Sequence, residues 1–258
     1  MLHLQRLSQA GFVLRGSGTS LVIDAFLSPR DDRLVPPGVL PEDLAGMDGI
    51  VATHEHKDHL DLAALEGLLA ASPAAQVVVP APISDLVAPL VGAGRIARAT
   101  VGHDIRIGQA RITPVPACHG RQVADAYTFG QELSGGLHRY LGYVVELAGV
   151  RVYHAGDTIA YDGMAERLRD LRVDVALLPI NGRSPEREAR GLVGNLDHIG
   201  AADLAAAARI PALVPMHHDT IRGNTGSVDD LRGYVRERHA ALRVVEIAPF
   251  NEIAWPAG

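Results

Sequence analysis

The sequence lacks several features that mark exported or membrane proteins. It contains a single cysteine, Cys118, so no disulfide can form within the chain, which fits a reducing cytoplasm. The first residues show no apolar run after a basic residue, so we expect no signal peptide. No uninterrupted apolar run reaches the ~18 residues that a membrane-spanning helix requires. We therefore expect a cytoplasmic protein with no membrane partner.

Basic residues are also scarce. Lysine and arginine together number 24 against 30 acidic residues, and Lys57 is the only lysine. The net charge of -6 argues against a nucleic-acid partner, because nucleic-acid-binding domains are usually basic. Hydrophobic residues make up 47% of the 258 residues, which is typical of a globular chain. No linker-like segment divides the chain, so we expect one domain over residues 1–258 and leave its oligomeric state open.

Three histidines and two aspartates are concentrated in the short stretch from Thr53 to Asp61. Imidazole nitrogen and carboxylate oxygen are ligands that zinc, manganese and iron accept. The apolar run Gly49 to Thr53 precedes the cluster, and leucines at helical spacing follow it. Asp61 is the expected N-cap of that helix. The cluster therefore occupies a strand-to-helix turn, at the carboxyl end of a strand, where open α/β sheets bind ligands.

The spacing within this cluster predicts two neighbouring metal ions. Positions two apart in an extended backbone point the same way, so His54, His56 and Asp58 could converge. His59 follows Asp58 directly, so the chain must curl to bring its ring to the same place. We assign His54 and His56 to a first ion, and Asp58 and His59 to a second.

Three further candidate ligands follow other β-type runs. His119 would supply the third imidazole for the first ion, which the opening cluster leaves incomplete. Asp157 could bridge the two ions, because a carboxylate has two oxygens. His217 lies at a strand end and is preferred over its neighbour His218 as the last ligand of the second ion.

Other polar residues near these run ends have less specific assignments. Asp24 could accept a hydrogen bond from a ligand histidine or serve only as a turn residue. His154 and Cys118 are expected to pack in the interior rather than bind metal. Arg183 and Asn181 follow another strand and are our candidates for substrate binding. The guanidinium fork of Arg183 could hold an anionic substrate, or it could be an ordinary surface arginine.

Strand-like and helix-like segments alternate in both halves of the chain. This alternation predicts two β-sheets packed face to face with helices outside. Pro215 lies within a β-type run, which predicts an edge or terminal position for that segment. The longest irregular segment, Gly120 to Leu137, has the length at which loops often cover substrates.

The motif H-x-H-x-D-H at residues 54–59, followed by His119, Asp157 and His217 in that order, resembles the metallo-β-lactamase superfamily. The resemblance covers nearly the whole chain. It implies an α/β (α+β) fold, a four-layer αββα sandwich with a dinuclear site along one edge. It also implies the following ligand sets: His54, His56 and His119 on the first ion, Asp58, His59 and His217 on the second, and Asp157 between them.

A narrower resemblance is to the L-ascorbate-6-phosphate lactonase branch. It is carried by these segments: Leu178 to Arg183, Gly194 to Leu196, Val214 to His217, Gly142 to Glu146, and Gly156 to Thr158. Those enzymes open a phosphorylated sugar lactone and are manganese-linked, which implies a small anionic substrate here. Ser184 and Gly200 stand where that branch usually has acidic residues, and the segment Asp125 to Leu137 has no counterpart that we can place.

These features predict a metal-dependent hydrolase of the lactonase or esterase type, with two zinc or manganese ions. A water shared by the ions would lose a proton near neutral pH and attack a lactone or ester carbonyl. Asp58 would relay a proton to the leaving oxygen. A phosphodiesterase or nuclease is the alternative, which the acidic composition disfavours. A third possibility is a metal-binding protein without activity. It is disfavoured because structural zinc sites are usually closed and four-coordinate, whereas seven candidate ligands are present here.

Overall fold

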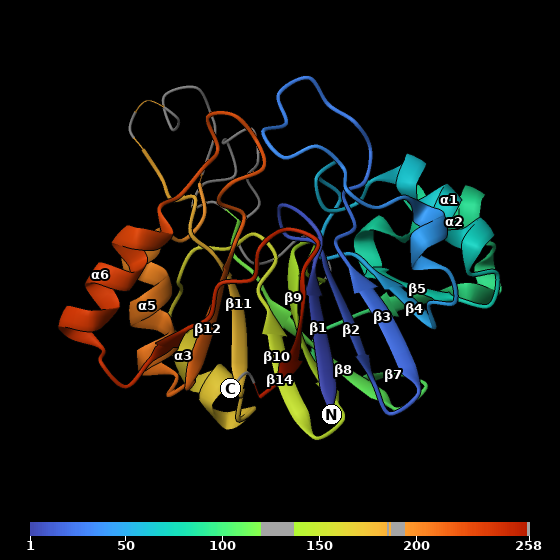
Figure 1. The fold of residues 1–258 in the computed structure, drawn as a ribbon. Coiled ribbons are helices and arrows are strands. Elements are labelled where there is room, and N and C mark those ends of the chain that lie inside the picture. The colour runs from blue at the N-terminus through green and yellow to red at the C-terminus, as the bar shows by residue number, and fades with distance from the viewer. Residues whose placement is uncertain (120–136, 185, 187–193, 257–258) are drawn as a thin grey trace.

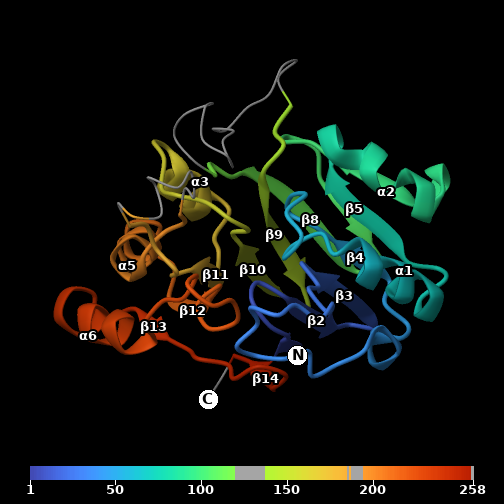
Figure 2. The ribbon, with the colours of Figure 1, turned by 90° about the horizontal axis from the view of Figure 1, so that it is seen from above.

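The computed structural model describes residues 1–119, 137–184, 186 and 194–256. In this part of the chain, two β-sheets of seven strands each pack face to face, and helices cover their outer faces (Figures 1 and 2). The predicted four-layer αββα sandwich is therefore confirmed. The assignment of residues 1–258 to a single domain stays a prediction.

The first sheet begins with antiparallel strands and continues with parallel ones. In spatial order its strands are β14 (Glu252–Trp255), β1 (Leu2–Arg6), β2 (Phe12–Gly16), β3 (Thr19–Ile23), β4 (Gly49–Val51), β5 (Gln76–Pro80) and β6 (Ile96–Ala99). A tight turn joins β2 and β3, as the sequence Gly16-Ser17-Gly18 predicts. Ser17 and Gly18 both have positive φ, at 49° and 74°, as a tight hairpin turn of the right twist requires.

The second sheet is likewise half parallel and half antiparallel. In spatial order its strands are β13 (Arg243–Val244), β12 (Ala212–Met216), β11 (Val175–Pro179), β10 (Val150–His154), β9 (Leu141–Leu147), β8 (Ala110–Pro116) and β7 (Ile105–Ile107). Strands β10, β11 and β12 run parallel side by side, so the segments that follow their carboxyl ends lie at one edge of the sheet.

Helices lie on both outer faces. The helices α1 (Leu62–Ala71) and α2 (Ser84–Val91) cover the first sheet, and α3 (Met164–Asp170), α5 (His198–Ala207) and α6 (Val228–Arg238) lie beside the second (Figure 2). Short 3-10 turns span Pro41–Leu44, Ala81–Ile83 and Ala93–Arg95. The predicted N-cap of α1 is confirmed, since the side chain of Asp61 accepts a hydrogen bond from Ala64 N. Asp197 caps α5 in the same way through Gly200 N.

Alternating side chains of each strand serve two hydrophobic cores. Val78 of β5 faces the core between the two sheets, whereas its neighbours Val77 and Val79 face the core under α1 and α2. This is the period of two expected of a strand buried on both faces. The layers follow from these apolar runs, because each sheet face has to be covered by another apolar surface.

Some element bounds differ from the prediction. The composition of the run Leu242 to Ile247 predicts a strand, but only Arg243–Val244 pairs, at the sheet margin. The strand Ile96–Ala99 was not predicted, because it lies at the other sheet's margin and carries an exposed arginine instead of a continuous apolar run. Pro215 lies in β12 beyond the last residue that pairs with β13, so its missing N–H leaves no partner unsatisfied there.

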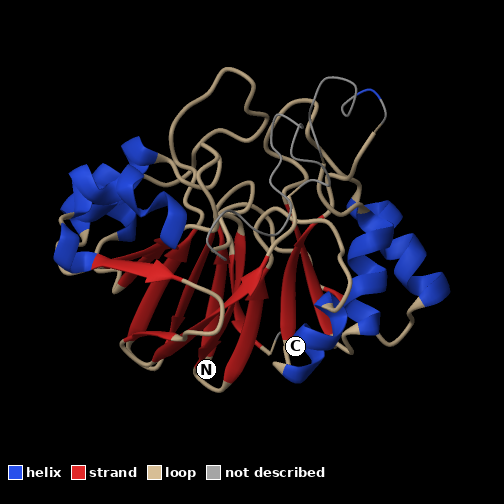
Figure 3. Ribbon diagram, turned by 180° about the vertical axis from the view of Figure 1, so that it is seen from behind, coloured by secondary structure: helices blue, strands red, loops and turns tan. Residues whose placement is uncertain are grey.

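Long connecting segments gather at one edge of the sandwich (Figure 3). The N-terminus lies toward the opposite edge (Figure 1), and β14 ends beside it, since Leu2 pairs with Trp255. Among the described residues, no helix is both long and apolar enough to cross a membrane. The edge with the long connections is where the predicted metal ligands have to meet.

Candidate metal centre

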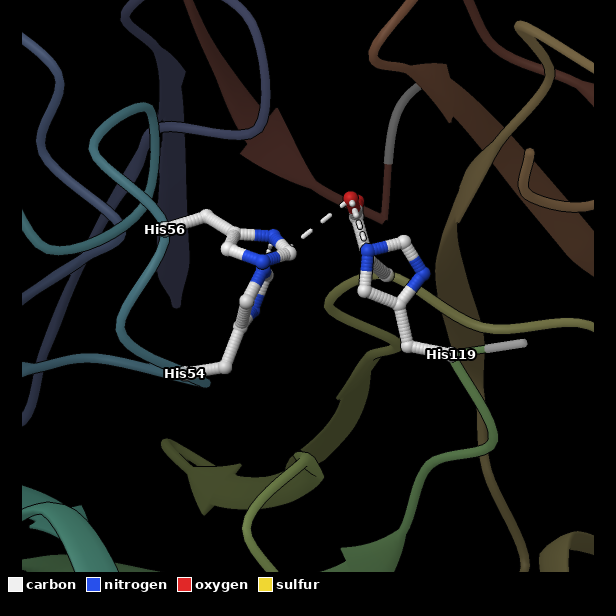
Figure 4. A group of neighbouring side chains, drawn as sticks. His54, His56 and His119 are labelled. Atoms are coloured by element: carbon white, nitrogen blue, oxygen red, sulfur yellow. Dashed lines mark hydrogen bonds and ion pairs between the residues drawn. The ribbon is translucent and has the colours of Figure 1, made fainter. Parts of the chain in front are cut away.

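All seven predicted ligand residues meet at this edge, in two groups. The first group comprises His54, His56, His119 and Asp157, and the second comprises Asp58, His59 and His217. Within each group, one ligand atom of every residue lies within 4.8 Å of the others. Figure 4 shows the rings of His54, His56 and His119 turned toward a common space. The six other residues are divided as the sequence predicted, and Asp157, which was predicted to lie between the two ions, is grouped with the first three histidines.

The route by which the ligands reach this place differs from the prediction. The sequence placed each ligand directly after a strand, but β4 ends at Val51, three residues before His54. His119 and Asp157 likewise follow the last residues of β8 and β10 by three positions, and only His217 comes directly after its strand. The chain first leaves the sheet and then turns across its edge, so side chains from both sheets can face one another.

The His54–His59 segment is a tight turn and not the extended chain that the spacing suggested. The backbone N–H groups of His59 and Leu60 both donate to the carbonyl oxygen of His56, at 2.9 and 2.7 Å. This turn separates His54 and His56 from Asp58 and His59, which explains why one short motif contributes to both groups. The curl that was predicted from the adjacency of Asp58 and His59 is present.

Asp157 lies between the two groups and presents one oxygen to each. Its Oδ2 is 3.5 Å from His119 Nε2 and 4.0 Å from His54 Nε2. Its Oδ1 is 3.2 Å from His59 Nε2 and 3.4 Å from His217 Nε2. This arrangement is what a carboxylate that bridges two cations needs.

Gly156 allows Asp157 to approach the opening cluster. Its φ is +60°, a conformation that residues with a side chain rarely adopt, and a Cβ at this position would lie 2.8 Å from the Cβ of Thr53. The loop after β10 therefore packs directly on the residue that precedes His54. A glycine here brings ligands from the two sheets together.

Asp24 links the two groups through hydrogen bonds to Thr53 and His59. The sequence left open whether it is a turn residue or a hydrogen-bond acceptor, and it has the geometry of both. Its φ is 50°, and its carboxylate accepts from Thr53 N at 2.8 Å, Thr53 Oγ1 at 2.7 Å and His59 Nδ1 at 2.7 Å. With Nδ1–H donating to Asp24, Nε2 is the nitrogen of His59 that faces the group, and it would offer a lone pair to a cation once it gives up its proton. Thr53 Oγ1 is also 3.0 Å from His54 Nδ1, which orients that ring in the same sense.

Burial and neighbouring charges shift the pKa values of the histidines in opposite directions. Burial lowers the pKa of His54 and of His119, and it lowers the pKa of His56 to about 3, so the first group consists of neutral imidazoles. Burial also acts to lower the pKa of His59. The carboxylates of Asp157, Asp24 and Asp58 outweigh it and raise that pKa well above its usual value.

The two carboxylates of the groups remain ionised. Burial acts to raise the pKa of Asp157 and of Asp58, but the imidazoles of His217 and His59 hold both pKa values below the usual range. The raised pKa of His59 favours a proton on this ring, which balances part of the negative charge. A cation would replace that proton, as expected for a site whose ligands must be deprotonated.

The donor atoms fit divalent metal ions. His59 Nε2 and Asp157 Oδ1 are buried, and neither makes a hydrogen bond within the described residues. His54 Nε2 and His56 Nδ1 are 2.9 Å apart, a distance at which one neutral ring can donate a hydrogen bond to the other. Buried polar atoms normally have partners, and a cation at each group would supply them.

The two predicted substrate-binding residues lie after β11, next to the segments that carry Asp157 and His217. Arg183 is exposed. Asn181 is buried, and its amide accepts from Asn195 Nδ2 at 3.1 Å and donates to Asn224 Oδ1 at 2.7 Å. It therefore connects three loops at this edge, and substrate binding by either residue stays a prediction. The predicted substrate-covering loop, Gly120 to Leu137, falls almost entirely at residues 120–136, which lie outside the described residues.

The predicted packing residues have the expected surroundings. Cys118 is buried beside His119. His154 is fully buried and accepts from Gly156 N at 3.2 Å through Nδ1, so Nε2 carries the hydrogen and donates to Ala10 O at 2.7 Å. It joins the loop that holds Asp157 to the β1–β2 turn of the other sheet.

The turn after β12 directs the side chains of His217 and His218 to different places. His217 has a φ of 58° and points into the second group, whereas His218 is buried against the charge of Arg6. Burial and that charge lower the pKa of His218 to about 4. Arg6 itself is 1% exposed and donates from Nη2 to Asp219 Oδ1 at 2.5 Å, which fixes the turn.

Two residues near the groups were not identified from the sequence. Tyr140 places its ring 5.1 Å from that of His54 and 5.3 Å from that of His119, measured between centroids. Gln9 is fully buried in the β1–β2 turn, and its Nε2 is 3.0 Å from Asp58 Oδ2. Neither lies in a motif. The only sequence signal for Gln9 is a polar pair, Ser8 and Gln9, between apolar runs.

Comparison with known proteins agrees with this geometry. Residues 19–218 match the family model described as "Beta-lactamase superfamily domain". A "UPF0173 metal-dependent hydrolase" of Methanoculleus marisnigri is 31% identical over 259 residues, covering 98% of this chain and 96% of that protein.

Solved structures show the same fold. Igni18, described as a novel metallo hydrolase from Ignicoccus hospitalis, has a TM-score of 0.73 at 21% identity, covering 98% of this chain and 97% of its own. An isothiocyanate hydrolase from Delia radicum gut bacteria has a TM-score of 0.76 at 18% identity, with coverage of 98% and 99%. The family match, the identity to the archaeal relative and the two His/Asp groups place this chain in the β-lactamase superfamily, among its metal-dependent hydrolases.

Proposed function

We propose that this metal-dependent hydrolase cleaves a lactone or ester bond in a small anionic molecule, with two divalent ions, zinc or manganese, held by the seven His and Asp residues. The observation that carries the proposal is Asp157, whose two oxygens each face a different group of imidazoles. A structural metal site has no need of two adjacent groups joined by a bridging carboxylate.

The bound ions would lower the pKa of a shared water to ~7 and polarise the carbonyl of the substrate. The residues of the chain prepare the site for this. The neutral rings of His54, His56 and His119 leave their lone pairs available, and Asp24 fixes the tautomer of His59. Buried walls around the groups strengthen every charge interaction within them.

Asp58 is the residue that we assign to proton transfer. Its side chain is 19% exposed, against 6% for Asp157 and 0% for Asp24, so it is the carboxylate that a substrate can approach. Its lowered pKa means that it enters the reaction ionised and can accept a proton from the attacking water. It would then deliver that proton to the leaving oxygen.

An anionic substrate group is assigned to Arg183. The segment that carries Arg183 follows β11, and β11 lies between β10 and β12, whose ends carry Asp157 and His217. An exposed guanidinium at this position can bind a carboxylate or phosphate through two hydrogen bonds. The acidic net charge of the chain is compatible with a small-molecule substrate and disfavours nucleic acid.

The test is a panel of neutral lactones, phosphorylated or carboxylated lactones, aryl esters and bis-aryl phosphodiesters, each with added zinc or manganese. We expect turnover of lactones or esters. His56→Ala and Asp157→Ala are expected to lose metal and turnover together. Arg183→Ala is expected to raise KM for anionic lactones and to leave KM for neutral ones unchanged.

Several outcomes would contradict this proposal. Faster turnover of the phosphodiesters than of every lactone and ester would favour the phosphodiesterase alternative. Full turnover by Asp157→Ala would reject the two-ion site. Equal changes in KM for charged and neutral lactones in Arg183→Ala would remove the assigned role of that residue.

A further inference from the structure

A buried arginine of the first sheet contacts the turn that carries His217. Arg6 is the last residue of β1 and is 1% exposed. Its Nη2 donates to Asp219 Oδ1 at 2.5 Å, and its Nη1 donates to Ile247 O at 3.2 Å. Arg6 and Asp219 are 213 positions apart, so this ion pair joins β1 to the turn after β12 of the other sheet.

The backbone of Arg6 is held on several sides. β1 pairs with β2 along one edge and with β14 along the other. Arg6 N donates to Asn251 O at 3.0 Å, and Phe250 N donates to Arg6 O at 2.8 Å. The guanidinium therefore extends from a fixed strand end, and a contact with it fixes the position of Asp219 relative to the first sheet.

The turn that Arg6 contacts has an unusual backbone conformation at His217. The φ of His217 is 58°, which is uncommon for residues other than glycine. His217 N donates to Gln9 O at 2.9 Å, and Thr220 Oγ1 accepts from Gln9 N at 2.7 Å and donates to Asp219 Oδ1 at 3.0 Å. Such a conformation persists only where surrounding contacts enforce it. Asp219 Oδ1 is the atom at which these contacts and the charge of Arg6 meet.

Stability by itself does not explain why this ion pair is buried. Removing two charges from water often costs more free energy than their attraction returns, and apolar replacements of buried ion pairs are frequently neutral or stabilising. Arg6 is also incompletely satisfied, because its Nε is buried and makes no hydrogen bond within the described residues. A directional contact can instead impose one arrangement of two segments, and here one of the segments carries His217.

We propose that Arg6 is a positioning residue, which holds the imidazole of His217 in the second group through its ion pair with Asp219. The effect on metal binding rests on the proposed function, because it requires the two-ion site. The effect on the conformation of the turn does not. An apolar residue at position 6 could fill the same volume, but it could not fix the direction of the Asp219 side chain.

The test separates the stability of the chain from the position of the turn. Arg6→Met leaves Asp219 without its partner, and Asp219→Asn leaves the guanidinium buried without an opposite charge. The double variant Arg6→Met/Asp219→Asn removes both charges together, so neither remains alone. Arg6→Lys keeps the positive charge. Val87→Ala is the control for a general loss of stability, because Val87 is fully buried in the core between α2 and the first sheet.

Three quantities are measured for each variant. They are the urea midpoint of unfolding, the hydrogen-exchange rate of the His217 amide relative to the amides of β11 in the metal-free protein, and the dissociation constants of the first and second equivalents of Zn²⁺ from chelator competition. Comparison with β11 removes the contribution of global unfolding from the exchange rate.

We expect each single substitution to lower the urea midpoint and the double variant to recover much of the loss. Arg6→Met, Asp219→Asn and the double variant should all raise the relative exchange rate of the His217 amide. All three should weaken the second equivalent of Zn²⁺ by at least ~10-fold and leave the first unchanged. Arg6→Lys should lie closer to the wild type than Arg6→Met in both quantities, and Val87→Ala should change the midpoint alone.

Four results would overturn the inference. Recovery of the second equivalent together with the midpoint in the double variant would show that the pair serves stability alone. Wild-type affinity and exchange in Arg6→Met would show that the turn does not need the arginine. Equal weakening of both equivalents, in proportion to the loss in the midpoint, would assign the effect to general destabilisation. If the wild type binds no second ion, the two-ion site is rejected, and the relative exchange rate alone then decides this inference: an unchanged rate in the double variant would reject it as well.

Discussion

Replacing Asp24 with asparagine tests how a residue that does not face the metal groups controls them. Asp24 is fully buried, and its two oxygens accept three hydrogen bonds, two from Thr53 and one from His59 Nδ1. An asparagine has the same shape but carries two N–H donors on one side. If its oxygen stays on Thr53 N, the new NH2 group faces His59 Nδ1–H. If it turns over, the NH2 group faces Thr53 N–H.

Either orientation lowers the free energy of unfolding by an amount that can be estimated. Losing a hydrogen bond to a charged acceptor in the interior lowers the free energy of unfolding by about 1.5 to 3 kcal/mol. The first orientation also forces His59 to move its hydrogen to Nε2, which removes the lone pair that faces the second group. Loss of such an orienting partner typically weakens metal binding by about 10- to 100-fold. His54 contacts Asp24 only through the hydroxyl of Thr53, so the first ion should be affected less.

The assay is chelator competition on each equivalent of metal, with urea unfolding of the metal-free protein alongside. The matched control is Asp61→Asn. Asp61 is also a buried aspartate that accepts several N–H and O–H donors, from Leu27, Ser28 and Ala64, and these contacts support the start of α1. We expect a comparable loss of stability in both variants and a loss of metal affinity in Asp24→Asn alone. Equal metal affinities in the two variants would refute the tautomer argument.

Three further predictions follow from the same geometry. Metal at ~100 times its Kd should add ~2.7 kcal/mol per ion to the free energy of unfolding, so removing it with a chelator should lower the thermal midpoint by roughly 5 to 10 °C per ion. An unchanged midpoint would mean that neither group holds metal. Gly156→Ala should reduce metal affinity and stability together, because the added Cβ would lie 2.8 Å from Thr53 at a φ of +60°. Gly163→Ala is the control for backbone strain alone, because φ is also positive there but the added Cβ meets no atom within 4 Å. Burial lowers the pKa of His154 below its ordinary value of 6.5, so the folded chain keeps this ring neutral and its contribution to stability is present above pH 6.5 and lost as the pH falls below it. The difference in free energy of unfolding between the wild type and His154→Gln should therefore shrink from pH 7.5 to pH 5.5, by at most ~1.4 kcal/mol per pH unit, and a constant difference in urea unfolding would contradict this.

The sequence alone was sufficient for the layers of the fold and for naming the seven His and Asp residues that meet at one edge of the sandwich. Apolar runs with a period of two predict strands, and helical spacing of leucines predicts α1, because both are local properties of neighbouring residues. The ligands were recognisable because metal binding restricts side chains to a few chemical types. His54 to His59 also lie so close in sequence that their proximity in space follows from chain connectivity.

Element ends and loop paths were less predictable. The strands that lead to His54, His119 and Asp157 end three residues before these residues, and the strand at the start of the apolar run Gly49 to Thr53 already ends at Val51. A strand ends where its pairing partner ends or where the chain must turn, and neither is visible in one segment. The shortness of β13, Arg243–Val244, has the same cause.

Only the tertiary structure decided which residues support the ligands. Gln9 and His217 are 208 positions apart, and His154 and Ala10 are 144 apart, yet each pair is in hydrogen-bonding contact. The positive φ values of Gln9, Asp24 and His217 are imposed by these contacts, since their own residue types do not demand them. Sequence patterns record what each segment prefers by itself, so they identified the His and Asp residues that converge at the candidate metal centre. The packing of one sheet on the other determined how those residues are oriented, which tautomer they adopt and what stands beside them.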